Sequence, residues 1–269
     1  MLRLGLVAAL LFALVPPVAG AQDYPQAQPQ PRSTDAATLL ALARAREVRE
    51  RIELGFRHEL KGDWKAAAAE FTRVLTLGPK EPQGSTARYD LGLAQAHLGQ
   101  LAASAGSFQA AIALDPDFFA ARANLVAVQL LRNDLVAARK AADELLARDG
   151  TSARGLYERG LVALRSGDAA TALGDFGALL QFNPGYATAR YDLALAEMKL
   201  ERFTDAERDL RAALEVAPQF ARARFALGAV LLRTGKRDQA RLAFEAAAQS
   251  AQDPSLRELA ASMRDSLKN

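Results

Sequence analysis

The sequence predicts an all-α protein in which helix–turn–helix units stack as an α-solenoid. Three observations lead to this prediction: short phrases recur at a constant spacing, helix-breaking residues separate them, and the composition favours helices. Half of the residues are hydrophobic but only 7% are aromatic, and alanine and leucine, two strong helix formers, dominate that half. A repeat of this kind determines the fold, because each unit buries its apolar faces only against its neighbours.

The repeat has a spacing of 34 residues. Closing phrases end in proline at Pro79, Pro116, Pro184 and Pro218; the last step is 34 residues and the one before it is twice that length. Gly150, another helix breaker, lies halfway along the longer step. Opening phrases keep the same register: ARYDLG from Ala87, ARANLV from Ala121, ARYDLA from Ala189 and ARFALG from Ala223.

A 34-residue helical hairpin resembles the tetratricopeptide repeat, and the residues agree position by position. The shared positions are a small residue in the first helix, a turn glycine, a small residue in the second helix and a bulky residue four positions later. They are filled by Gly55, Gly92, Gly160, Ala194 and Gly228; by Gly62, Gly99, Gly167 and Gly235; by Ala67, Ser104, Ala138, Ala172, Ala206 and Ala240; and by Phe71, Phe108, Phe176, Leu210 and Phe244. Val126, Asn133, Ala142 and Glu201 depart from the pattern. The resemblance implies a right-handed solenoid.

The repeats occupy residues 34–252 in six units, together with a preceding N-terminal helix that continues into the first unit. Their expected bounds are about 48–81, 85–118, 119–152, 153–186, 187–220 and 221–252. Ser33 or Thr34 is expected to cap the N-terminal helix. A C-terminal capping helix is expected over 255–269, because Leu256, Leu259, Ala260, Met263 and Leu267 follow helical spacing.

The first 21 residues are expected to be a cleaved secretory signal peptide. Arg3 precedes an apolar stretch over 4–15, and Ala19-Gly20-Ala21 fits the small-residue cleavage rule, so we expect a cut after Ala21. The apolar stretch is shorter than the roughly 20 residues of a spanning helix, which disfavours an uncleaved anchor. We therefore expect a periplasmic or secreted protein, without a transmembrane span after cleavage. Residues 22–33 are rich in proline and glutamine and are expected to be a disordered linker.

Composition excludes several functions. With 0 cysteines there is no disulfide, thiol nucleophile or cysteine-ligated metal, and 2 histidines disfavour a multi-histidine metal site. The sequence has no phosphate-binding loop, dinucleotide fingerprint, zinc-protease motif or hydrolase elbow, so we expect no enzyme, no cofactor and no catalytic or metal-binding residues. His58 is interpreted as a packing residue. A net charge of +3, or +2 once Arg3 is removed, disfavours a nucleic-acid partner.

The resemblance implies a partner-binding concave groove lined by the first helices. Steps of 34 residues place an aromatic-leaning row beside an aliphatic one, an acidic-leaning row next to them, and a basic-leaning row further along. The groove candidates are Tyr89, Leu93, Asn124, Tyr157, Leu161, Tyr191, Leu195 and Phe225, with Arg165, Lys199 and Arg233 from the basic-leaning row. The acidic-leaning row is Asp90, Asn124, Glu158 and Asp192. The two charged rows are expected to flank an apolar track that suits a peptide with apolar anchors.

An aromatic stripe at repeat spacing has a second interpretation, which is packing between adjacent first helices. The charged rows can likewise be solvated faces or ion pairs between repeats. Some relatives hold a terminal carboxylate with a Lys/Asn/Arg clamp, but Tyr89 and Leu93 stand where such a clamp has lysine and asparagine, and Asn124 alone matches.

The sequence therefore predicts a non-enzymatic scaffold or adaptor of the cell envelope that binds a peptide or protein segment. The partner would belong to an assembly or secretion complex. The alternative is a periplasmic chaperone-like holdase for exported clients. The two differ in stoichiometry, because an adaptor has one defined partner and a holdase has many.

Overall fold

The structure is a computed structural model that describes residues 35–267. Every regular element in that range is an α-helix, as the sequence predicts. The expected signal peptide (1–21), the linker (22–33) and the last two residues of the expected capping helix, 268–269, lie outside the described residues. The chain divides into two compact units, Met1–Ala141 and Ala142–Asn269.

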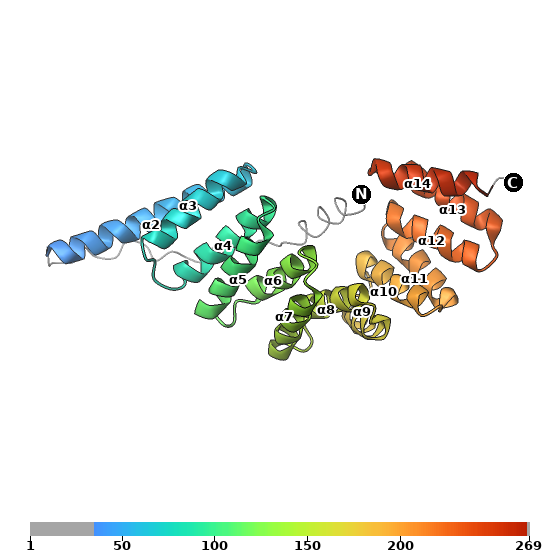
Figure 1. Ribbon diagram of the computed structural model, residues 1–269, viewed down its shortest axis with the longest axis horizontal. Coiled ribbons are helices and arrows are strands. Elements are labelled where there is room, and N and C mark those ends of the chain that lie inside the picture. The colour runs from blue at the N-terminus through green and yellow to red at the C-terminus, as the bar shows by residue number, and fades with distance from the viewer. Residues whose placement is uncertain (1–34, 268–269) are drawn as a thin grey trace. The chain divides into compact units, whose positions relative to one another are not determined.

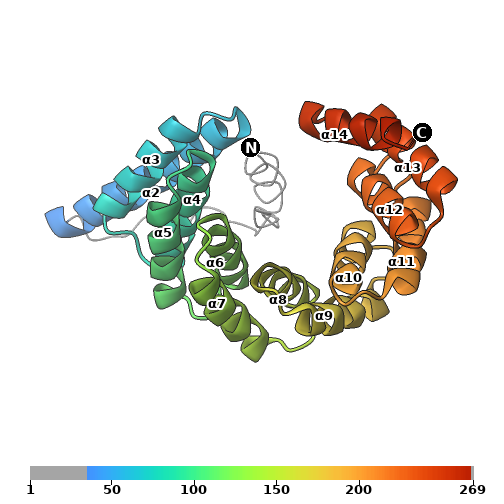
Figure 2. The same ribbon diagram turned by 45° about the vertical axis from the view of Figure 1, so that its right-hand side comes forward.

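The described part of the first unit consists of helical hairpins. Its helices are α2 (Ala36–Leu60), α3 (Trp64–Thr76), α4 (Gln83–His97), α5 (Leu101–Leu114), α6 (Phe119–Leu131) and the first half of α7 (Leu135–Arg148). α2 pairs with α3 and α4 pairs with α5, while α3–α4 and α5–α6 contacts join successive hairpins (Figure 1). The expected N-terminal helix and the first helix of the first repeat form one continuous element, α2, which extends past the end of α3 (Figure 2).

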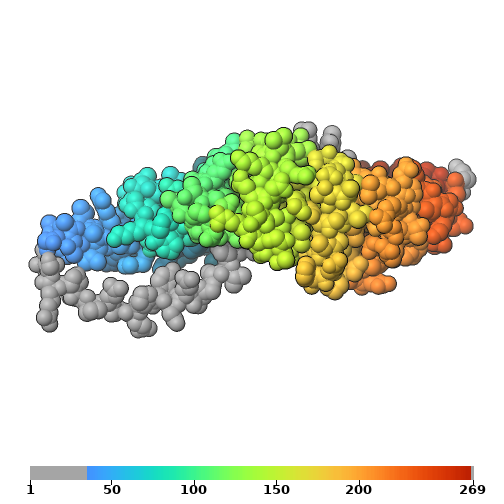
Figure 3. All heavy atoms as spheres, turned by 90° about the horizontal axis from the view of Figure 1, so that it is seen from below, coloured from blue at the N-terminus to red at the C-terminus, as the bar shows by residue number. Residues whose placement is uncertain are grey.

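The second unit continues with the same arrangement. After the end of α7 it contains α8 (Ala153–Ser166), α9 (Ala169–Phe182), α10 (Ala187–Lys199), α11 (Phe203–Val216), α12 (Ala221–Arg233), α13 (Arg237–Ser250) and α14 (Pro254–Asp265). The hairpins are α8–α9, α10–α11 and α12–α13, and α14 packs on α13 as an additional helix. On the face shown in Figure 3, the side chains from yellow to red form a surface without a visible opening.

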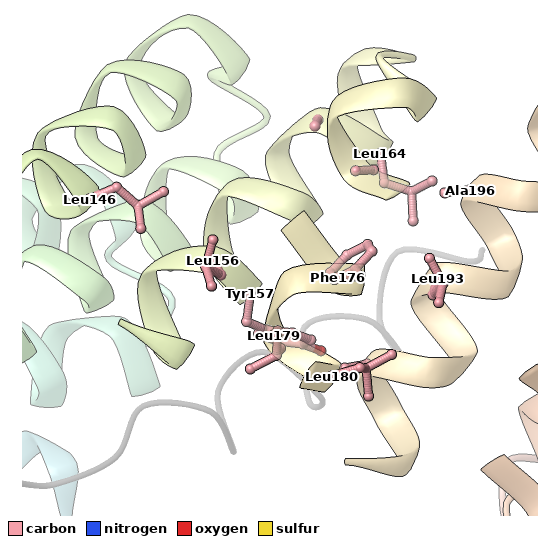
Figure 4. Packing of buried hydrophobic residues seen from close by; sticks show 12 residues of the cluster. Leu146, Leu156, Tyr157, Leu164, Phe176, Leu179, Leu180, Leu193 and Ala196 are labelled. Carbon is pink, nitrogen blue, oxygen red and sulfur yellow. The ribbon is translucent and has the colours of Figure 1, made fainter. Parts of the chain in front are cut away.

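In four hairpins a glycine of the first helix faces a phenylalanine of the second. A Cβ atom on Gly92 would lie 2.7 Å from the Phe108 ring, and one on Gly160 would lie 2.6 Å from the Phe176 ring. Only a residue without a side chain allows this approach, so the glycine determines how closely the two helices pack. Figure 4 shows the resulting core of the second unit, where Phe176 and leucines from α8, α9 and α10 come together.

The turns between paired helices keep a left-handed residue even where the sequence departs from glycine. Gly167 has φ +86°, and Asn133 and Glu201 adopt φ +59° and +56° at the corresponding positions. Asparagine tolerates this region, whereas glutamate adopts it at an energetic cost. The two departures in the sequence are therefore substitutions within one turn geometry.

Several helices begin at a residue whose side-chain oxygen accepts a backbone N–H of the first turn. The N-cap of α2 is Asp35, whose carboxylate accepts the N–H of Thr38 at 2.6 Å, so the expected cap at Ser33 or Thr34 is wrong by one or two positions. Arginines near the start of first helices reach back to the preceding closing proline. Arg122 donates to the Pro116 carbonyl at 2.7 Å and Arg190 to the Pro184 carbonyl at 2.9 Å, so each arginine holds the loop that joins the previous helix to its own.

Candidate functional site

The predicted aromatic row lies on the first helices, and two of its tyrosines are fixed by hydrogen bonds to the next repeat. In the first unit, Asn124 of α6 donates its amide N–H to the hydroxyl of Tyr89 of α4 at 3.0 Å. In the second unit, the hydroxyl of Tyr157 of α8 donates to Asp192 of α10 at 3.0 Å. Both bonds join residues 35 positions apart. That distance is one repeat of 34 residues plus one, so the partner of each tyrosine lies in the next repeat, one position further along.

The two tyrosines are also enclosed by aromatic rings. Tyr89 packs on Phe108 and on Phe118, with ring centroids 5.7 and 4.8 Å apart. Tyr157 packs on Phe176 and stacks on Tyr186, at 6.0 and 5.3 Å. Each tyrosine therefore belongs to a cluster of three rings and one hydrogen bond. Both tyrosines are therefore packing residues between adjacent repeats.

Four of the expected groove residues are consequently buried. Tyr89 is 0% exposed, Asn124 2%, Leu93 5% and Tyr157 9%. These side chains join adjacent helices, so the expectation that they face a partner is wrong for this structure. The physical reason is that a buried tyrosine hydroxyl needs a hydrogen-bond partner, and the next repeat supplies one.

The acidic-leaning row is buried as well, so it does not flank the track as expected. Asp90, Asn124, Glu158 and Asp192 are each at most 7% exposed. Arg154 lies 2.6 Å from Glu158 in an ion pair without hydrogen-bond alignment, and burial raises the pKa of the Glu158 carboxyl. Burial also raises the pKa of Asp90, and the carboxyl of Glu59 adds to this effect.

Asp192 is a buried acid whose carboxyl lies near polar and charged groups of the neighbouring first helices. Burial raises its pKa to about 7, while the Tyr157 hydrogen bond and the nearby guanidinium groups of Arg222 and Arg165 oppose that shift. The groups that face Asp192 of α10 therefore come from the two neighbouring first helices, α8 and α12. This cluster connects the three first helices of the second unit.

The remaining apolar groove candidates stay partly accessible. Leu161 of α8, Tyr191 and Leu195 of α10 and Phe225 of α12 are half-buried, with one part of each side chain in the core; we name these four residues the open track. α10 contacts both α8 and α12, so the track runs across three neighbouring helices. Tyr191 packs on Phe220 with ring centroids 5.0 Å apart, and Phe225 packs on Phe244 at 5.2 Å.

The sequence differs at the position that follows Tyr191 by one repeat and one residue. The residue 35 positions after Tyr191 is Ala226, where the other two junctions have Asn124 and Asp192. An alanine methyl group offers the Tyr191 hydroxyl neither a donor nor an acceptor. Burial raises the pKa of Tyr191 to about 12, and the carboxylate of Asp192 adds to this effect.

Basic side chains accompany the open track. Lys199 and Arg233 are exposed at the ends of α10 and α12, and Arg165 is half-buried at the end of α8. The Arg233 guanidinium lies 5.1 Å from the centre of the Phe203 ring, and Arg222 lies 5.7 Å from that of Phe220. Both distances are within cation–π range, so these cations are positioned on aromatic surfaces.

Four residues of this site were absent from the sequence prediction. They are the aromatics immediately before or at the start of first helices, Phe118, Tyr186 and Phe220, and the cation Arg222. The three aromatics recur in steps of 34 or twice 34 residues, so the same repeat alignment contains the signal that finds them.

Other chemistry is limited in the described part of the chain. His97 stacks on Trp64 with ring centroids 3.7 Å apart, and His58 Nδ1 lies 3.7 Å from the Asp63 carboxylate. Within residues 35–267, no group of three or more metal-ligating side chains is arranged to hold an ion. In the same range, no helix has both the length and the apolar character needed to cross a bilayer.

Comparison with known proteins identifies the repeat. A family model described as tetratricopeptide repeat matches residues 61–118, 99–153, 128–187 and 191–255, which together are more than half of the chain. No curated protein matches the chain.

Several solved structures share the fold. A tetratricopeptide repeat protein from Parabacteroides merdae is 18% identical, with a TM-score of 0.60 over 83% of this chain and 100% of that one. YrrB, described as a tetratricopeptide protein with an unusual peptide-binding site, is 17% identical, with a TM-score of 0.56 over 73% and 100%. A thermophilic protein of this type from Thermus thermophilus is 25% identical, with a TM-score of 0.55 over 66% and 98%. The predicted solenoid fold class is thus confirmed, and the chain belongs to the tetratricopeptide repeat family.

Proposed function

We propose that this protein is a non-enzymatic interaction scaffold that binds a segment of a partner protein on the open track of its second unit. The observation that carries the proposal is the half-buried row of Leu161, Tyr191, Leu195 and Phe225 beside exposed cations. Aromatic side chains that are held in place and still partly accessible are effective anchors, because little conformational entropy is lost when they bind.

The chemistry of the track specifies the kind of segment. Apolar side chains of the partner would pack on Tyr191, Leu195 and Phe225, and its acidic side chains would lie near Lys199, Arg222 and Arg233. An extended or helical segment with alternating apolar and acidic residues meets both conditions. The peptide-binding relative YrrB supports a role of this type for the fold.

We further propose that the scaffold acts in the cell envelope, in the periplasm or after secretion, within an assembly or secretion complex. The support is the apolar stretch over 4–15 followed by the Ala19-Gly20-Ala21 cleavage pattern. N-terminal sequencing of the protein from fractionated cells tests this location. We expect Gln22 as the first residue in the envelope fraction; a cytosolic chain that retains residues 1–21 would overturn the location but not the binding site.

Affinity purification from the native cells tests the function. We expect one partner in a fixed ratio with the wild-type chain, and its loss when Tyr191 and Phe225 are both replaced by alanine. Phe182→Ala is the matched control, because Phe182 is a 65%-exposed phenylalanine on the second helix α9. Many partners in small amounts would instead support the holdase alternative. A partner that survives the double replacement would overturn the proposed site.

A further inference from the structure

The two ends of the described chain are finished differently. At the C-terminal end, α14 covers α13, with Ala260 buried and Met263 and Leu267 packed on the core. At the N-terminal end, α2 packs on the next helices through its buried residues Val48 and Gly55 and through the Phe56 ring, which lies edge-on against Phe71 of α3 with centroids 5.7 Å apart. Terminal elements of repeat proteins normally present a polar outer face. The outer face of α2 departs from that rule.

The outer face of α2 carries a heptad stripe. Seven residues alternate at spacings of three and four along the helix, and all seven are exposed: Leu39, Leu42, Arg46, Arg49, Glu53, Phe56 and Leu60. Leu39, Leu42 and Leu60 are 53%, 48% and 89% exposed. Residues at this spacing lie on one face of the helix, the face along which paired helices contact each other. The stripe is apolar at both ends and charged in the middle.

The order of the charges selects the occupant. Along the stripe, Arg46 and Arg49 precede Glu53, so a second copy running antiparallel brings arginine opposite glutamate. In the register in which Leu42 meets the partner copy's Leu60, Arg49 meets the partner copy's Glu53 and Arg46 meets its Phe56. The two-fold axis repeats each of these contacts. A parallel pair would instead place like charges opposite each other.

The segment that precedes α2 is a poor cover for the stripe. By composition, residues 22–34 contain Tyr24 as their one large apolar side chain and three prolines, which disfavours a helix with an apolar face. In this register residues 42–60 of the two copies overlap, a stretch of about 28 Å and between two and three heptads.

We infer that α2 is a self-association surface through which two copies of this chain pair as an antiparallel coiled coil. This interface uses the outer face of α2 and does not depend on the proposed function of the open track. The intrahelical Arg46–Glu50 and Arg57–Glu53 pairs, at 2.7 and 3.5 Å between N and O, are exposed and can exchange partners on association.

Charge exchange tests the pairing. For the mature chain from the native cells, sedimentation equilibrium up to about 100 µM should detect a dimer. Arg49→Glu should raise the dissociation constant by about tenfold or more, because two attractive pairs become repulsive. Adding Glu53→Arg to that variant should restore the dimer. Arg211→Glu, which removes a comparable exposed arginine paired with Glu207 on α11, should leave the dimer unchanged.

Engineered cysteines test the register, since the sequence has 0 cysteines of its own. The Leu42→Cys/Leu60→Cys variant should form a disulfide-linked dimer on mild oxidation, whereas each single variant should not. Self-crosslinking of the single variants would indicate a parallel pair and overturn the proposed arrangement. A chain that stays monomeric throughout the concentration range would overturn the interface altogether. Circular dichroism checks that each variant retains its helices.

Discussion

Two junctions between first helices in the second unit use the same kind of tyrosine in opposite ways. At the α8–α10 junction, Tyr157 donates to Asp192 and is 9% exposed. At the α10–α12 junction, Ala226 occupies the position aligned with Asp192, and Tyr191 is half-buried. Both rings pack on an aromatic that precedes the next first helix, Tyr186 or Phe220. One side chain in the following repeat thus distinguishes a structural tyrosine from an accessible one.

The comparison shows how a repeat protein localises binding without changing its fold. Every repeat contributes the same positions, so recognition depends on where the sequence leaves a junction incomplete. In this chain the incomplete junction coincides with exposed Lys199 and Arg233, which adds charge to an apolar anchor. Binding and stability are therefore expected to separate between the two tyrosines.

The largest expected effect is on stability. Tyr157→Ala should lower the free energy of unfolding by about 3–5 kcal/mol, because it removes a buried ring and leaves Asp192 without its donor. Tyr191→Ala should cost about 1–2 kcal/mol, because part of that ring is already in water. Urea unfolding followed by circular dichroism measures both. Equal losses for the two variants would contradict the distinction between the junctions.

The second effect is the pH dependence of stability that arises from Asp192 at the α8–α10 junction. Asp192 has a pKa of about 7 in the folded chain, above the ordinary aspartate value of 3.8, so the folded state binds more protons between these values. The contribution of Asp192 to stability therefore falls as the pH rises from about 4 to about 7. Asp192→Asn should remove this loss. The difference in free energy of unfolding between the variant and the wild type should therefore favour the variant by about 1–3 kcal/mol more at pH 8 than at pH 5.

Unfolding of the wild type and of this variant at both pH values measures that difference directly. Glu59 and Glu197 also have pKa values raised to about 7 by burial, and they are present in both proteins, so their contribution cancels. A variant whose stability changes with pH as much as that of the wild type would show that Asp192 is not the titrating group.

The third effect is on binding. Ala226→Asn introduces an amide at the position aligned with Asn124. It should donate a hydrogen bond to the Tyr191 hydroxyl, as Asn124 does to Tyr89, and so make the Tyr191 ring less accessible. We expect the affinity for the co-purified partner to fall by about tenfold, since an anchor becomes unavailable at a cost of about 1.4 kcal/mol. Ala226→Ser, which is too short to copy the amide, is the control. Isothermal titration calorimetry measures the affinity, and unchanged binding with a protected Tyr191 would argue against this anchor.

The smallest effect separates stability from recognition. Glu201 adopts φ +56° in the turn of the α10–α11 hairpin, and glycine would adopt it without a Cβ penalty. Glu201→Gly should therefore stabilise the chain by about 1 kcal/mol and leave partner affinity unchanged. Thermal unfolding and the same calorimetry provide the two numbers. Weaker binding by this stabilised variant would mean that the site depends on the turn rather than on the open track.

Sequence reasoning recovers the hairpins because their signal is local. The Gly92–Phe108 and Gly160–Phe176 pairs are each 16 residues apart. A glycine is required at these positions because any Cβ atom there would lie within 3 Å of the phenylalanine ring. Repeat alignment therefore predicts both the helices and their close approach. The continuation of α2 into the first repeat follows from an uninterrupted helical pattern.

The candidate site was recovered only in part, because exposure depends on pairs that lie one repeat apart. Aligned rows place Tyr89, Tyr157 and Tyr191 at one position, and nothing within a row distinguishes them. Asn124 and Asp192 belong to a different row and bond the tyrosines only after the helices pack, whereas alanine stands at the aligned position 226. Burial of the acidic-leaning row has the same origin, since its members face neighbouring helices.

In-cell photo-crosslinking tests most directly whether the open track is the binding surface. A benzophenone amino acid replaces Phe225 on the open track in one strain and Phe182 on the second helix α9 in another, so that one phenylalanine in each strain carries the probe. We expect a defined partner crosslinked at position 225 and none at position 182. Crosslinks at position 182 with none at position 225 would contradict the proposed site.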